Sequence, residues 1–239
     1  MTTRWGFSGQ AAILVTVATN ESLAMADIVK ANAPLLKRAG FKKRRYGFNR
    51  RGEDGVVHVV HFWMAPFEPP AWTEVPGLRE RRYGGFRLDF GVWVPEMKRT
   101  NVPRGDWIYE YDCHLRATIG QLFTGDDTTD FWWDLFDLDA ASKSAAALVE
   151  YGLPWLDRFP SRTRILSGYE DLGALGIGMS PAGGLDIAEL YDALGRHKDA
   201  RRTLERYVEG SVLKSHSVYL GPYLVARGYA DLVELIRTR

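Results

Sequence analysis

The sequence has almost no cysteine: Cys113 is the only one among its 239 residues. A lone cysteine excludes an internal disulfide and a zinc site made of several thiolates. It is typical of a small, buried apolar side chain in a reducing compartment. We therefore expect a cytoplasmic protein without a disulfide framework.

The sequence also lacks an excess of either charge and lacks a long apolar run. Lys and Arg number 31 against 30 Asp and Glu, so net charge favours neither nucleic acid nor an anionic membrane as a partner. No stretch approaches the roughly 18 apolar residues of a membrane span. A short apolar run at residues 11–18 precedes small residues at 24–26, but Thr16 interrupts it, which disfavours a signal peptide. We expect no membrane association and interpret residues 1–24 as an N-terminal extension.

Apolar and aromatic side chains are plentiful, at 46% and 13% of the chain, so a stable core is expected. Residues 21–39 have the pattern of a helix with Asn20 or Ser22 as its cap and Leu23 among its apolar positions. Pro34 should kink this helix, and Gly40 should end it.

Four segments then predict strands. Residues 86–94 alternate strictly, and residues 107–116 repeat the alternation with one apolar and one polar face. Residues 56–64 are β-branched and aromatic throughout, which indicates a central strand, and residues 41–50 form a plausible fourth strand. The sequence therefore predicts an α+β fold: an antiparallel sheet of four or five strands with helices on one face, followed by an all-helical C-terminal part.

From about residue 130 onward the strand pattern gives way to helical spacing. We expect a glycine-rich loop at residues 173–184 and then two helical hairpins with turns near Gly195 and Gly228. The first hairpin looks like one tetratricopeptide unit and the second like a degenerate one, although ordinary helical hairpins explain the pattern equally well. Two such units are too few to fold alone, so they should dock on the preceding domain. The predicted division is 1–24, 25–160 and 161–239.

Parts of the chain resemble a bacterial family of unknown function, DUF4304. The resemblance rests on residues 35–50, on residues 86–95 and on the Leu-Pro-Trp-Leu motif at 153–156, and it spans about residues 25–159. It implies a bacterial protein, and it carries no catalytic role onto any residue.

Two charged clusters stand out. A basic cluster suits either an anionic partner, such as a nucleic acid, or an exposed sheet edge protected by charge. An acidic cluster matches no calcium loop, so it indicates helix caps and a solvated face, and we expect no metal or cofactor. The basic residues are Lys37, Arg38, Lys42, Lys43, Arg44, Arg45, Arg50 and Arg51, and the acidic ones are Asp126, Asp127, Asp130, Asp134, Asp137 and Asp139.

The polar face of the predicted strand 107–116 supplies the candidate site. Glu110, Asp112 and His114 are its candidate catalytic residues because carboxylates and an imidazole can transfer protons in a cleft. The candidate binding residues are Arg44, Arg45, Arg87, Asp89 and Arg116. Cross-strand ion pairing on a wetted sheet accounts for the same residues without any chemistry.

The imidazoles and the thiol form no dyad on this reading. His58 and His61 should face opposite sides of their strand, as should Cys113 and His114. The leading hypothesis is therefore a non-enzymatic binding protein with a protein partner, because eight Trp and eleven Tyr suit an interface. An immunity-like, toxin-neutralising role is one use of such a surface. The alternative is a hydrolase or nucleic-acid-processing enzyme in which Arg44 and Arg45 position a phosphate.

Overall fold

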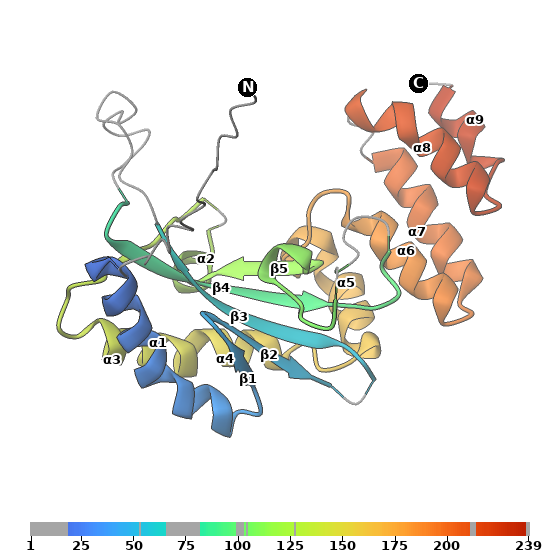
Figure 1. Ribbon diagram of the computed structural model, residues 1–239. Helices are drawn as coiled ribbons and strands as arrows, with labels where there is room; N and C mark the ends of the chain where they lie inside the picture. Colours follow the sequence, from blue (N-terminus) through green and yellow to red (C-terminus); the bar gives the residue numbers. More distant parts are fainter. Residues whose placement is uncertain are drawn as a thin grey trace, which may run out of the picture.

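The structure, a computed structural model, is α+β, as the sequence predicts (Figure 1). It describes residues 19–52, 54–65, 82–98, 103, 105–126, 128–210 and 214–237. Most of the segment between the second and third predicted strands, residues 66–81, lies outside this description, as do residues 1–18.

The sheet is an antiparallel meander in the order β1-β2-β3-β4-β5, with a short strand β6 also paired to β4. The third strand lies at its centre, as predicted for residues 56–64. The strands are β1 Lys42–Arg44, β2 Gly47–Arg51, β3 Val57–Met64, β4 Gly85–Trp93, β5 Leu115–Thr118 and β6 Trp133–Asp134.

Two strand predictions differ from the structure. The single strand predicted at 41–50 is a hairpin, because the chain reverses at Arg45, whose φ of 54° is left-handed. The strand pattern also reappears once after residue 130, as β6, where Trp133 stacks on Phe86 with ring centroids 5.3 Å apart.

The strand predicted at 107–116 is wrong for most of its length. Residues Glu110–Asp112 form a 3-10 turn, and β5 begins only at Leu115. The turn closes on itself: the Asp112 carboxylate accepts the Tyr109 N–H at 2.9 Å, and the Asp112 N–H donates to the Tyr109 carbonyl at 3.0 Å. A short acidic side chain thus gives the backbone an alternative to strand pairing.

Helix α1, Asn20–Arg38, forms as predicted, but Thr19 is its cap, with its hydroxyl accepting the Ser22 N–H at 3.2 Å. The helix runs through Pro34 to Arg38. Leu23, expected on the apolar face, is 54% exposed, while Met25 is fully buried. The predicted boundary at residue 24 therefore falls inside this helix.

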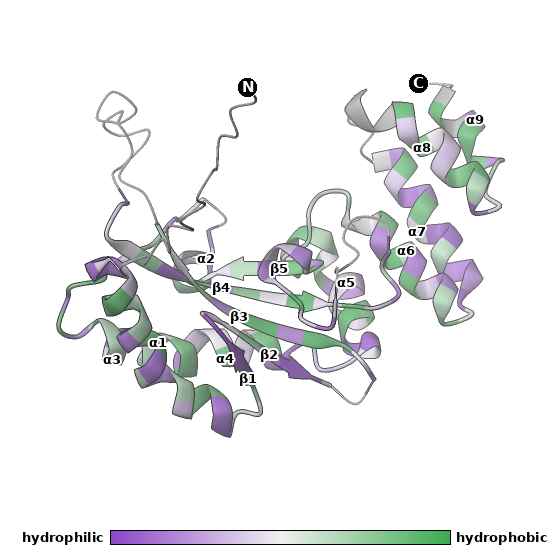
Figure 2. Ribbon diagram, viewed as in Figure 1, coloured by the Kyte–Doolittle hydropathy of each residue, from purple (hydrophilic) through white to green (hydrophobic). Residues whose placement is uncertain are grey.

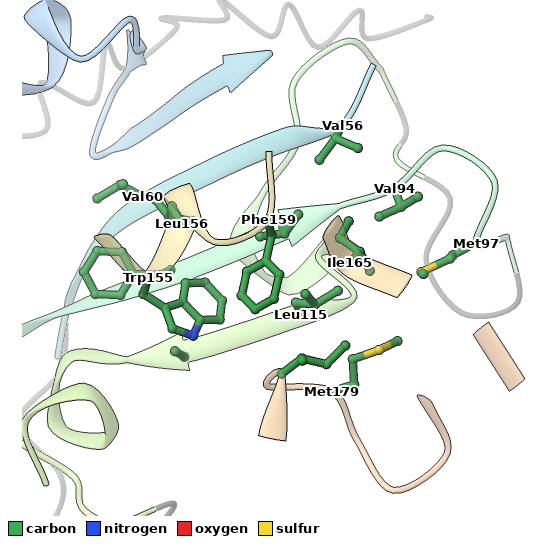
Figure 3. Close-up of a cluster of buried hydrophobic side chains, with 14 of the residues drawn as sticks. Val56, Val60, Val94, Met97, Leu115, Trp155, Leu156, Phe159, Ile165 and Met179 are labelled. Carbon is green, nitrogen blue, oxygen red and sulfur yellow. The ribbon is translucent and has the colours of Figure 1, made fainter. Parts of the chain in front are cut away.

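Helices α1, α3 and α4 cover one face of the sheet (Figure 1). α3 spans Ala140–Ala147, and a π-turn at Leu148–Gly152 joins it to α4, Leu153–Asp157. Figure 3 shows Trp155, Leu156 and Phe159 packed toward the sheet. A Cβ at Gly152 would overlap the Phe90 ring, so this glycine permits the close approach of helix and sheet.

The rest of the chain is helical. α2, Ile119–Thr124, follows β5, and the C-terminal helices are α5 Arg162–Gly176, α6 Gly183–Ala193, α7 His197–Gly210, α8 Lys214–Ala226 and α9 Leu232–Arg237. The glycine-rich loop is shorter than predicted because helical residues extend to Gly176, although Gly173, with φ 71° and ψ 179°, breaks α5 where the loop was expected to begin. The hairpin turns at Gly195 and Gly228 are confirmed, with φ of 73° and 82°. In the described part of the chain, no helix combines the length and the apolar character that crossing a bilayer requires.

The C-terminal helices share a core with the sheet domain, although Figure 1 shows α6 to α9 stacked away from the sheet. The Glu189 carboxylate of α6 accepts the Lys98 N–H at 2.7 Å, and Arg162 of α5 pairs with Glu96 at 2.6 Å. The hairpins are therefore docked on the preceding domain. Their relation to tetratricopeptide repeats stays a prediction.

Candidate functional site

The second face of the sheet, opposite the helices, is partly covered by the segment that contains the 3-10 turn. Cys113 and Ile108 from this segment pack on Val57, Val59 and Trp93. An ideal Cβ on Gly91 would lie 2.5 Å from the Cys113 Sγ, so the glycine is what lets the turn lie flat on β4. Burial raises the pKa of the Cys113 thiol well above its usual range, which leaves it a small apolar side chain, as predicted.

Two of the three candidate catalytic residues hold the backbone. The His114 ring is buried, and its Nδ1 accepts the Val94 N–H at 3.1 Å. The Asp112 carboxylate caps the 3-10 turn through the Tyr109 N–H. Neither lines the pocket that Glu110 reaches.

The third candidate, Glu110, does reach a pocket, together with Arg87, Asp89 and Arg116. The pocket has a volume of about 320 Å³, and its walls include Gln121, Leu175 and Met179. In it the Arg87 Nε lies 2.8 Å from the Asp89 Oδ1, and the Arg116 Nε lies 3.9 Å from the Glu110 Oε1. The structure thus brings together four of the predicted site residues, although the strand expected to carry two of them is largely a turn.

The loop after α5 forms the far wall of this pocket, here called the carboxylate pocket. The Arg116 N–H donates to the Gly178 carbonyl at 2.7 Å, which satisfies the outer edge of β5. Gly178 has a φ of 78°, and a Cβ there would overlap the Arg116 backbone. The two segments are therefore held in direct contact.

Burial governs the charges of the carboxylate pocket. It raises the pKa of Asp89 to about 6, against the opposing effect of Arg87, and Glu110 and Asp130 raise it further. The pKa of Glu110 is also raised, first by burial, although Arg116 and Arg87 oppose the change. Asp89 is therefore partly protonated near pH 6, an unusual property for a carboxyl group in a cleft.

His61 lies directly opposite Asp89 in the β3–β4 register. Burial and the nearby Arg87 lower the pKa of His61, so its ring is neutral at pH 7. His58 faces the other side of β3, as predicted. It is buried against the Phe159 carbonyl, 2.9 Å from its Nε2, and beside Arg50 at 2.8 Å from its Nδ1.

Beside the carboxylate pocket, an arginine contacts two indoles that also contact each other. The Arg87 guanidinium lies 5.1 Å from the rings of both Trp63 and Trp132, which contact each other edge to face at 5.4 Å. Asp130 fixes the arrangement, because its Oδ1 lies 3.2 Å from the Arg87 Nη1 and accepts the Trp132 indole N–H at 2.6 Å. Arg82 pairs with the same carboxylate.

Tyr109 and Tyr111 flank the pocket residue Glu110 along the chain, at the start of the 3-10 turn and within it. Their rings stack at 5.2 Å and 5°, and they are 40% and 59% exposed. The Arg116 guanidinium donates to the Tyr111 carbonyl, which ties the turn to β5. We call Trp63, Arg87, Tyr109, Tyr111 and Trp132 the aromatic–arginine surface.

Sequence reasoning missed Trp63, His61, Asp130 and Trp132 as parts of this site. Trp63 and His61 are the β3 residues paired with Arg87 and Asp89 of β4, and the period of two already places both on one strand face. Asp130 was assigned to the solvated acidic cluster, because the sequence does not show that residue 130 folds back across β4.

The other predicted charges serve the fold. Lys42, Lys43 and Arg44 are exposed on β1, the edge strand, where charge blocks pairing with other chains. Arg45 lies in the adjoining turn. β2 and β3 separate β1 from the carboxylate pocket, so Arg44 and Arg45 are about 14 Å or more from it at the usual strand spacing.

The acidic cluster makes turns rather than a metal site. Carboxylates of Asp126, Asp134 and Asp137 each accept the N–H of the residue two positions on, at 2.8 to 2.9 Å. Asp127 lies outside the described residues. Within the described ranges, no group of three or more His, Cys, Asp or Glu side chains is placed to hold a metal ion.

Comparison of the chain with protein-family models, curated proteins and solved structures finds no match. The resemblance to DUF4304 therefore stays a prediction, and the function is argued from this site alone.

Proposed function

We propose that this protein is a non-enzymatic binding protein that holds a protein partner on the aromatic–arginine surface. The observation that carries the proposal is Arg87, which contacts both Trp63 and Trp132 and is held by Asp89 and Asp130. Tryptophan, tyrosine and arginine are the residues most enriched at the energetic centres of protein interfaces. A surface whose arginine is already ordered loses little entropy when a partner binds.

The charged side chains of the site are paired with one another, which supports a binding role over catalysis. Arg87 is neutralised by Asp89 and Asp130, and Arg116 is near Glu110. The remaining candidate catalytic groups, on Asp112 and His114, hold backbone N–H groups. We further propose a cytoplasmic location, which a lone buried thiol favours, and a bacterial immunity-like role as one use of the surface.

The test removes the exposed tyrosines. Tyr109→Ala/Tyr111→Ala should lower the affinity for a partner co-purified from cells of the source organism at least about tenfold, measured with both proteins purified. Leu138→Ala is the matched control, because Leu138 is 101% exposed and outside the surface. Circular dichroism checks that both variants fold. A partner bound equally by both variants would contradict the proposal.

A second candidate is acid–base catalysis by Asp89 and Glu110, favoured by the raised pKa of both carboxyls in one pocket. Protonated Asp89 would act as the general acid and ionised Glu110 as the base of a hydrolase. Turnover of phosphoester, glycoside or peptide substrates near pH 6, lost in both Asp89→Asn and Glu110→Gln, would establish this function in place of the first.

A further inference from the structure

Arg158 follows α4 and is an exposed arginine that pairs with no carboxylate among the described residues. Its guanidinium lies 5.3 Å from the centre of the Phe159 ring and makes no hydrogen bond to the described part of the chain. The neighbouring Asp157 is paired with Arg50 instead, at 2.5 Å. Within the described structure, the fold therefore uses none of the five N–H donors of the Arg158 guanidinium.

Arg158 and Arg116 line the same pocket, here called the arginine pocket, which has a volume of about 370 Å³. It adjoins the carboxylate pocket, because Arg116, Gln121 and Leu175 line both. None of the described residues that line the arginine pocket is acidic. Its described walls therefore carry two positive charges and no negative one, and its volume falls in the range of small-molecule sites.

The fold orients the Arg116 guanidinium and leaves some of its donors over. Its Nε donates to the Cys113 carbonyl at 2.9 Å, and one Nη donates to the Tyr111 carbonyl. Three of its five N–H groups are not used by these two carbonyls. The Arg116 side chain is 43% exposed, so it is open to a ligand. An arginine that is already oriented loses little entropy when it binds an anion.

Apolar side chains supply the rest of the wall. Leu175, near the end of α5, is 59% exposed, and Leu122 of α2 and the buried Trp155 also line the arginine pocket. Covering an exposed leucine with an organic group is favourable. The site is also distinct from the basic cluster, because the hydrophilic strand β1 in Figure 2 lies at the opposite edge of the sheet from β5.

We propose that the arginine pocket binds a small organic anion through a phosphate or carboxylate group. A guanidinium can hold either group through two parallel hydrogen bonds. A phosphate monoester, with a charge of about −1.5 to −2 at pH 7, matches two arginines better than a single carboxylate does. Neither Arg116 nor Arg158 belongs to the aromatic–arginine surface, so this site goes beyond the proposed protein-binding function.

The ligand test is isothermal titration calorimetry on the full chain with three compounds that share a phenyl ring. Phenyl phosphate and benzoate carry the two anionic groups, and benzyl alcohol is the neutral control. Phenyl phosphate should bind at least about tenfold more tightly than benzyl alcohol, because hydrogen bonds to charged groups contribute about 1.5–3 kcal/mol. Tighter binding of benzoate than of phenyl phosphate would support the site with a carboxylate as its ligand group.

Three results would overturn the proposal. They are equal binding of benzyl alcohol and the anions, no binding of either anion at millimolar concentration, and binding of inorganic phosphate as tight as that of phenyl phosphate.

The variant test removes one arginine. Arg158→Gln should lower the affinity for the tighter of the two anions at least about tenfold. Arg164→Gln is the matched control, because Arg164 is exposed on α5 and does not line the pocket, and it should change the affinity less than about twofold. Circular dichroism checks that both variants fold.

Arg158 also follows the C-terminal end of α4, where a cation is favourable without any ligand. If this were its whole role, Arg158→Gln would lower the melting temperature and leave anion affinity unchanged. Unchanged affinity in Arg158→Gln, or equal losses in the two variants, would overturn the proposal.

Discussion

Asp89 shows how a single residue sets the character of the site. It is 3% exposed on the second sheet face and is surrounded by Arg87 on its own strand, His61 on β3, Glu110 in the turn and Asp130. Burial disfavours the charged form of Asp89 more than Arg87 favours it. Between the pKa values of the unfolded and folded states, the folded protein therefore keeps a proton on this carboxyl that the unfolded chain has lost.

This difference makes stability depend on pH. Between the usual pKa of 3.8 and the folded value of about 6, the folded state binds more protons, so stability falls as pH rises through this window. The full difference corresponds to about 3 kcal/mol. Relative to Asp89→Asn, the natural chain should lose up to about that amount of unfolding free energy between about pH 4 and pH 6.5.

Urea unfolding at several pH values measures this loss. Asp171→Asn, on the exposed side of α5, is the control and should follow the natural chain at every pH. A constant difference between Asp89→Asn and the natural chain across the window would show that Asp89 has no raised pKa.

At the scale of elements, glycines decide how closely the layers approach. Gly152 ends the π-turn between α3 and α4 directly over the Phe90 ring. The ring is fully buried, so it has no free space to move into. Gly210, at the end of α7, has no atoms near the position of a Cβ.

Gly152→Ala should therefore lower the free energy of unfolding by about 1–3 kcal/mol through overpacking. Gly210→Ala should change it by less than about 0.5 kcal/mol. Chemical denaturation of both variants measures the contrast. Equal effects would mean that the approach of α4 to β4 is looser than the structure has it.

Element prediction from the sequence succeeded where one face of a strand is fully buried. β4 is predicted correctly because its four core residues, Phe86, Leu88, Phe90 and Val92, alternate without interruption, a pattern that few other structures produce. Residues 107–116 alternate as well, but there the local bonds of Asp112 decide the backbone. A period of two does not distinguish a strand from a segment whose backbone is turned by such local bonds.

At the scale of the whole molecule, the candidate site depends on contacts between distant segments. The sequence paired Arg87 and Asp89 with Glu110 and Arg116 through an expected strand, and the chain brings the same four together through β5 and the turn. The sequence did not reveal that Asp130 and Trp132 belong to the site. Residues 130–134 fold back onto β4, and this long-range contact leaves no local signal in the sequence.

The proposed function depends most on direct contact between a partner and the aromatic–arginine surface. A photo-crosslinking amino acid placed at Tyr111, with Leu138 as the control position, tests that contact in cells of the source organism. We expect one protein to be crosslinked at position 111 and to be absent at position 138. No crosslinked protein at position 111, or the same proteins at both positions, would contradict it.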